Sequence, residues 1–199
     1  MSDYFEIKRE ILRSRMNIVF VDPIVGILVK IRFTPNIVTI LGFIIVSISA
    51  YFAAIGYFRT AGILVAFSGF LDIYDGALAR KLNLESPRGA LLDSTLDRLG
   101  EAIILLGIIY FYTLDQNLNI VMMASISMVF SLMISYLRAR IEGLGYNSKS
   151  GIFTRPERVF IVSTGLILFN PFITIVVLTI ATTIGLIHRF VIFWKMMRG

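Results

Sequence analysis

The stretch that decides the fold is Asp72-Ile73-Tyr74-Asp75-Gly76-Ala77-Leu78-Ala79-Arg80, followed at fixed spacing by Gly89, Asp93 and Asp97. These charges lie in a chain of 199 residues that is 57% hydrophobic and only 16% charged. Soluble domains are about one quarter charged, so the composition excludes an ordinary cytosolic enzyme, a secreted disulfide scaffold and a disordered chain. An ionised side chain inside a bilayer costs about 2.5–3.5 kcal/mol. Carboxylates kept in such a chain therefore indicate a functional site in a membrane protein.

Six apolar stretches surround this segment and predict an all-α fold. We expect a polytopic membrane protein with six transmembrane helices over residues 35–58, 61–81, 89–113, 117–141, 157–170 and 171–194. Residues 1–32 are too charged to span, and their alternating basic and apolar residues predict an N-terminal amphipathic surface helix. A frayed terminus is an equal alternative for residues 1–6. We expect one membrane domain over residues 1–199, with residues 35–194 as its transmembrane core.

The basic residues predict how the chain is oriented. With a cytoplasmic N-terminus, 18 of the 19 lysines and arginines fall on the inner side, and Arg59 alone falls outside. This bias predicts a multi-pass protein of the cell membrane whose two termini and active site face the cytoplasm. The net charge of +6 therefore indicates topology, and we expect no nucleic-acid partner. The chain has no cysteine and a single histidine, His188, which excludes thiolate chemistry and a cluster of imidazole ligands.

The aspartates are spaced so that they can converge. Asp72 and Asp75 are three residues apart, and Asp93 and Asp97 are four apart, so each pair shares one helical face. A short inner loop joins the two helices, which makes them antiparallel and brings the pairs together. Oxygen-only ligands favour a hard cation, Mg²⁺ or Mn²⁺, over Zn²⁺. Four negative charges could balance two divalent ions, an arrangement that is common in phosphoryl-type displacement.

Written out, the segment is D-x2-D-G-x2-A-R-x8-G-x3-D-x3-D, and the chain resembles the CDP-alcohol phosphatidyltransferase family. The resemblance implies a six-helix membrane enzyme, usually a homodimer, in the lipid bilayer. Such enzymes transfer a phospho-lipid moiety from a CDP-linked lipid donor to an acceptor hydroxyl and release CMP. By position, the implied metal ligands are Asp72, Asp75, Asp93 and Asp97, and Asp97 is also the implied general base.

The resemblance also implies residues that contact the donor. Besides Asp72, these are Gly76, Ala79 and Arg80 of the signature, Asn36 and Thr39 of a P-N-x-x-T element, and Ser86 of the inner loop. For Asn36, Thr39 and Ser86, capping of the following helix is an equally good explanation.

The acceptor is expected to be anionic, because several basic residues lie at the inner helix ends. We expect its phosphate to be bound by Ser135, Arg138, Arg155, Arg158 and Arg189. The segments R-A-R-x-E-G-L-G and R-P-E-R resemble the branch of the family that uses inositol 1-phosphate. Two alternatives stay open within the family: glycerol 3-phosphate as the acceptor, or a soluble CDP-inositol donor that yields a di-inositol phosphate. A divalent-cation transporter is the alternative from another class, although it predicts carboxylates spread through the whole bilayer depth.

Overall fold

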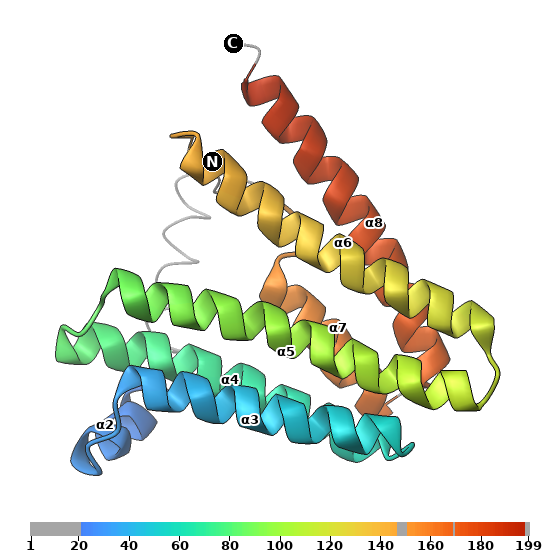
Figure 1. Ribbon diagram of the computed structural model, residues 1–199. Helices are drawn as coiled ribbons and strands as arrows, with labels where there is room; N and C mark the ends of the chain where they lie inside the picture. The colour runs from blue at the N-terminus through green and yellow to red at the C-terminus, as the bar shows by residue number, and fades with distance from the viewer. Residues whose placement is uncertain (1–20, 147–150, 169, 198–199) are drawn as a thin grey trace, which may run out of the picture.

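The protein was analysed as a computed structural model that describes residues 21–146, 151–168 and 170–197. Within these ranges it contains helices and no strand, which confirms the predicted all-helical fold (Figure 1). The helices are α2 (Asp22–Lys30), α3 (Pro35–Ala54), α4 (Phe58–Leu82), α5 (Pro87–Leu114), α6 (Leu118–Gly143), α7 (Arg155–Leu168) and α8 (Pro171–Met196). The predicted surface helix falls mainly on residues 1–20, which lie outside the described residues.

Each of the six predicted apolar stretches corresponds to one helix, from α3 to α8, with ends that differ by at most four residues. Local sequence explains the boundaries. Proline occupies the first turn of α3, α5 and α8, where its missing N–H costs nothing. The first stretch ends early because Gly56, at φ +85°, adopts a left-handed conformation that no helix continues through.

Four of these helices are long and apolar enough to cross a membrane, namely α3, α4, α6 and α8. The chain is therefore a multi-pass membrane protein. Helix α5 is long enough at 28 residues, but Asp93, Asp97, Arg98 and Glu101 lower the hydropathy of its first half. Helix α7 has only 14 residues, which at about 1.5 Å per residue is shorter than a bilayer core of about 30 Å.

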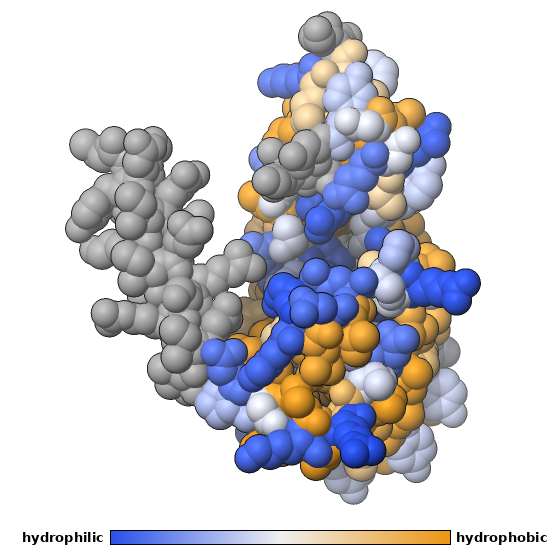
Figure 2. All heavy atoms as spheres, turned by 90° about the vertical axis from the view of Figure 1, so that its left-hand side faces the viewer, coloured by the Kyte–Doolittle hydropathy of each residue, from blue (hydrophilic) through white to orange (hydrophobic). Residues whose placement is uncertain are grey.

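Helix α3 packs against α4 and α5, α4 packs against α7, and α6 packs against α5 and α8. Helices α4 and α5 are antiparallel, so the end of α4 and the start of α5 lie at the same end of the bundle (Figure 1). Figure 2 looks onto that end and shows hydrophilic side chains gathered between apolar surfaces. Small helix α2 packs on α4 beside this end, where Val25 and Leu78 share a buried apolar cluster.

Helices α3 and α5 approach each other closely at Gly107. A Cβ atom there would overlap the backbone carbonyl of Ala50. We expect Gly107→Ala to destabilise the protein by about 1–3 kcal/mol, because the clash involves backbone that cannot rotate away. Thermal unfolding in detergent measures this effect. The control is Gly26→Ala, which places its Cβ where no atom lies within 4 Å; equal melting temperatures for the two variants would contradict this account of the packing.

Candidate active site

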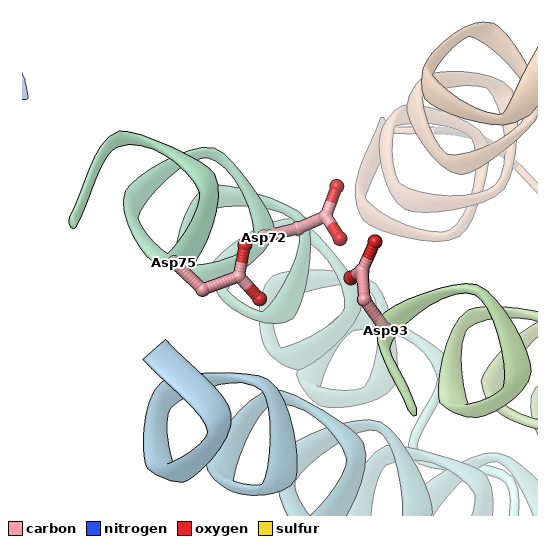
Figure 3. Close-up of side chains that lie close together, drawn as sticks. All are labelled: Asp72, Asp75 and Asp93. Atoms are coloured by element: carbon pink, nitrogen blue, oxygen red, sulfur yellow. The ribbon is translucent and has the colours of Figure 1, made fainter. Parts of the chain in front are cut away.

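Three carboxylates meet at the hydrophilic end of the bundle. Asp72 and Asp75 project from the last part of α4 and Asp93 from the first part of α5, and each offers an oxygen within 4.8 Å of the others (Figure 3). We call Asp72, Asp75 and Asp93 the acidic trio. The Oδ1 atom of Asp93 is buried and has no hydrogen-bond partner among the described residues. A buried carboxylate oxygen without a donor is costly, which indicates that a cation completes the site.

Helix α3 supports the trio from a third side. The Thr39 hydroxyl donates a hydrogen bond of 2.7 Å to Oδ2 of Asp75, which is 5% exposed. The same hydroxyl lies 3.1 Å from the carbonyl oxygen of Pro35, one turn earlier in α3. Thr39 therefore contacts the acidic trio directly and orients the Asp75 carboxylate.

Asp97 lies beside Asp72 and is also joined to it through Arg155, the first residue of α7. The Arg155 guanidinium lies 2.6 Å from Oδ2 of Asp72 and 2.6 Å from Oδ1 of Asp97. It thus bridges α4 and α5 and offsets part of their negative charge. The trio and Asp97 together hold four carboxylates against the one guanidinium of Arg155, a formal balance of −3. The donor set, the charge and the unpartnered oxygen of Asp93 all fit a divalent metal ion.

A narrow cavity of about 50 Å³ runs from these carboxylates into the bundle between α3, α4, α5 and α7. Thr39, Asp72 and Asp97 line its polar end, and Val65 and Ile104 line its apolar end. The cavity has room for water molecules rather than for a lipid chain.

The residues expected to contact the donor lie at the ends of α3, α4 and α5 that are near the acidic trio. Ser86 caps α5 by accepting a hydrogen bond of 3.1 Å from the Gly89 amide, so its capping role is observed directly. The amide oxygen of Asn36 lies 3.4 Å from where a Cβ at Gly89 would be. Along α4, Arg80 folds back over Gly76, and its Nη1 is 3.5 Å from where a Cβ at Gly76 would be. Ala79 is half-buried one turn after Asp75.

The residues expected to bind the acceptor are not all brought together. Arg189 on α8 is 3% exposed and donates to the carbonyl of Ile134 at 3.2 Å, beside half-buried Ser135 on α6. The Nε atom of Arg189 is buried without a hydrogen-bond partner in the described part of the chain. Arg138 pairs with Glu142 at 3.0 Å on the exposed surface of α6.

Arg158 was expected to bind the acceptor phosphate, but its side chain binds other protein groups. Its Nε and Nη2 atoms bind Oε1 and Oε2 of Glu101 at 3.2 and 2.8 Å, and its Nη1 donates to the Phe153 carbonyl at 3.0 Å. All three nitrogens are thus engaged inside the protein, where Arg158 is 3% exposed. Glu101 was missed as a residue of the site, although it continues the face of Asp97 four residues later and so carried a usable signal.

A bundle of apolar helices with a carboxylate cluster at one end is the arrangement of a membrane protein with a site that can hold a metal ion. The chain belongs to the CDP-alcohol phosphatidyltransferase family, whose family model matches residues 32–194. It is therefore a phosphotransferase of phospholipid synthesis.

Individual relatives agree with this assignment. The chain is 31% identical over 185 residues to an archaetidylinositol phosphate synthase of Methanothermobacter thermautotrophicus, a match that covers 90% of this chain and 91% of that protein. The crystal structure of Mycobacterium tuberculosis phosphatidylinositol phosphate synthase with CDP-DAG bound has a TM-score of 0.79 at 30% identity and covers 86% of this chain and 92% of that chain. The same enzyme in complex with manganese and citrate also has a TM-score of 0.79 at 30% identity, with 86% and 88% covered.

Proposed function

We propose that the protein transfers a phosphatidyl or archaetidyl group from a CDP-linked lipid to a hydroxyl of inositol 1-phosphate and releases CMP. The observation that carries the proposal is that a cluster of carboxylates lies next to partly or fully buried arginines. The acidic trio can hold a cation, and Arg155 and Arg189 can hold an anion beside it. Relatives named as inositol phosphate synthases support the choice of acceptor.

The donor is proposed to lie across the mouth of the site. Asp72 and the face formed by Gly76, Ala79 and Arg80 would accommodate the CDP portion, because glycine and alanine leave space and the guanidinium binds phosphate. Asn36, Thr39 and Ser86 border the same region from α3 and the α4–α5 loop.

Asp72, Asp75, Asp93 and Asp97 are proposed to hold the metal, either Mg²⁺ or Mn²⁺, as two ions. When bound, these ions neutralise the negative charge that develops on the pyrophosphate as CMP leaves. Asp97 is proposed in addition to accept the proton of the acceptor hydroxyl, whose own pKa is far above 7. Its ion pair with Arg155, which is proposed to bind the acceptor phosphate, supports this separate role.

Thr39 gives a test of the metal site that needs no turnover. We expect Thr39→Val to weaken Mn²⁺ binding by about 10–100-fold, because the Asp75 carboxylate loses the hydroxyl that orients it. Thr39→Ser keeps that hydroxyl and should bind Mn²⁺ like the wild type. Calorimetry on the protein without substrates makes the comparison, and equal affinity of the valine and serine variants would contradict the orienting role.

The acceptor phosphate is proposed to lie near Arg155 and Arg189, with Ser135 and Arg138 at its edge. The unpartnered Nε atom of Arg189 supports this, because a buried guanidinium nitrogen favours an anionic acceptor. Because Arg158 is paired with Glu101, we infer that Arg158 affects acceptor binding without contacting the acceptor phosphate.

A comparison of charged and neutral acceptors tests this proposal. The wild type should use inositol 1-phosphate and have little activity with free inositol. Arg189→Gln should raise the KM for inositol 1-phosphate by about 10–100-fold, as expected for the loss of a hydrogen bond to a charged group, and leave the KM for the CDP-linked lipid unchanged. A rise in donor KM alone would place Arg189 in the donor site instead.

We also propose that α5 and α7 join the four long apolar helices in a six-helix transmembrane core within a single domain, with the active site facing the cytoplasm, and that the short α7 crosses only part of the bilayer thickness. The positions of the charged residues support this arrangement, since Asp93, Asp97 and Arg155 lie near the starts of these helices, the ends that the bias of basic residues predicts to be cytoplasmic. A homodimer is proposed from membership of the family.

A further inference from the structure

A buried ion pair between Glu101 and Arg158 connects α5 to α7 and takes no direct part in the chemistry proposed above. Its contact is bidentate, with distances of 3.2 and 2.8 Å between the paired atoms. The side chains are 12% and 3% exposed. We call these two residues the α5–α7 clamp.

The clamp lies one helical turn deeper than a second ion pair on the same two helices. Glu101 follows Asp97 by four residues in α5, and Arg158 follows Arg155 by three residues in α7. Arg155 and Asp97 are themselves joined at 2.6 Å. Two ion pairs, one turn apart, therefore fix the distance between the start of α7 and α5. Of the two, only the pair of Arg155 and Asp97 also contacts the acidic trio, through Asp72.

The clamp also fixes the segment that leads into α7. Nη1 of Arg158 donates to the Phe153 carbonyl at 3.0 Å. Two residues earlier, Gly151 packs so closely on the Arg189 guanidinium that a Cβ atom there would overlap it. Through Phe153, the clamp thus holds residues 151–154 against Arg189, while through its helices it holds Arg155 against Asp97.

A contribution to folding stability does not by itself explain why the chain has a buried ion pair at this position. Removing two charges from water is expensive, and apolar side chains of similar volume often replace a buried ion pair without loss of stability. What an apolar pair cannot supply is a fixed bidentate geometry between two helices.

We propose that the α5–α7 clamp is a positioning device that sets the distance between the proton-accepting carboxylate of Asp97 and the phosphate-binding arginines Arg155 and Arg189. It would thereby fix where the acceptor lies relative to the donor. This inference rests on the proposed function, because it assigns Glu101 and Arg158 a larger effect on the acceptor than on the donor or the metal.

The decisive variant replaces both charges at once, Glu101→Leu with Arg158→Met, which avoids leaving one buried charge unpaired. We expect a folded protein whose Mn²⁺ affinity and KM for the CDP-linked lipid change much less than its use of the acceptor, because the clamp contains no residue of the acidic trio. Its KM for the acceptor should rise and its kcat should fall, for a combined loss in kcat/KM of about 10–100-fold, because a small misplacement of reacting groups is enough for such a loss. Wild-type acceptor KM in this folded double variant would overturn the proposal, as would an equal rise in donor KM.

A second variant covers the case in which the double variant does not fold. Arg158→Lys keeps the charge and most of the packing but reaches only one Glu101 oxygen, so its acceptor KM should lie between those of the wild type and the double variant. An unchanged acceptor KM in Arg158→Lys, with a lowered melting temperature, would show a purely structural role. The wild type tests the proposed function separately. If the wild type used glycerol 3-phosphate and not inositol 1-phosphate, the proposed acceptor would be wrong. The KM of the same variants would then be measured with glycerol 3-phosphate, which tests the clamp independently.

Discussion

Replacing Asp97 by asparagine is expected to lower the transfer rate by about 10³-fold, within the range observed when a general base is removed. The amide has the shape of the carboxylate, and its oxygen can still accept from Arg155, which now lies 2.6 Å from Oδ1 of Asp97. The donor should therefore bind nearly as it does in the wild type, and Mn²⁺ binding should weaken far less than the transfer rate falls. CMP release measures the rate, and Mn²⁺ calorimetry measures the site.

The matched control for this variant is Asp115→Asn. Asp115 is an exposed carboxylate at the opposite end of the same helix, α5, so its loss should leave both the rate and Mn²⁺ binding unchanged. Near-wild-type turnover by Asp97→Asn would remove the base role from Asp97. Loss of Mn²⁺ binding as severe as loss of rate would make Asp97 chiefly a metal ligand.

Asp93→Asn is expected to abolish both metal binding and transfer. The buried Oδ1 atom of Asp93 has no hydrogen-bond partner among the described residues. This oxygen is therefore available to bind a cation. We expect a loss of rate of at least about 10³-fold, since metal stabilisation of the transferring group is worth several kcal/mol. Calorimetry should detect no Mn²⁺ binding at concentrations that saturate the wild type.

Glu85→Gln is the control for Asp93→Asn. Glu85 lies in the loop between α4 and α5, at the same end of the molecule, but it is exposed and outside the acidic trio. It tests whether negative charge near the site is sufficient to attract the metal. A weakening of Mn²⁺ binding by Glu85→Gln as large as that by Asp93→Asn would show a diffuse electrostatic effect in place of a defined site.

The sequence predicted the helical fold and a cluster of four aspartates because both depend on local periodicity; the structure brings three of the four within 4.8 Å of one another and joins Asp97 to Asp72 through Arg155. Apolar runs bounded by Pro35, Pro87 and Pro171 gave helices whose ends the structure reproduces closely. The spacing of three residues from Asp72 to Asp75 placed both on one helical face, and the short α4–α5 loop brought Asp93 beside them.

The contacts between distant segments could not be predicted in the same way. The bond from Thr39 to Asp75 joins residues 36 positions apart, and the bond from Arg158 to Glu101 joins residues 57 apart. A basic residue at a helix end has the same sequence signature whether it sets membrane orientation, binds a ligand or pairs with a buried carboxylate. Only packing distinguishes Arg138 on the surface from Arg158 in the interior.

The most direct test of the central claim is CMP release by the purified protein supplied with CDP-diacylglycerol and Mg²⁺ or Mn²⁺. Inositol 1-phosphate and glycerol 3-phosphate are offered separately, each with and without a chelator. We predict CMP release with inositol 1-phosphate, none above background with glycerol 3-phosphate, and loss of activity with the chelator. Release with glycerol 3-phosphate alone would contradict the proposed acceptor, and release that survives the chelator would contradict the metal-dependent site.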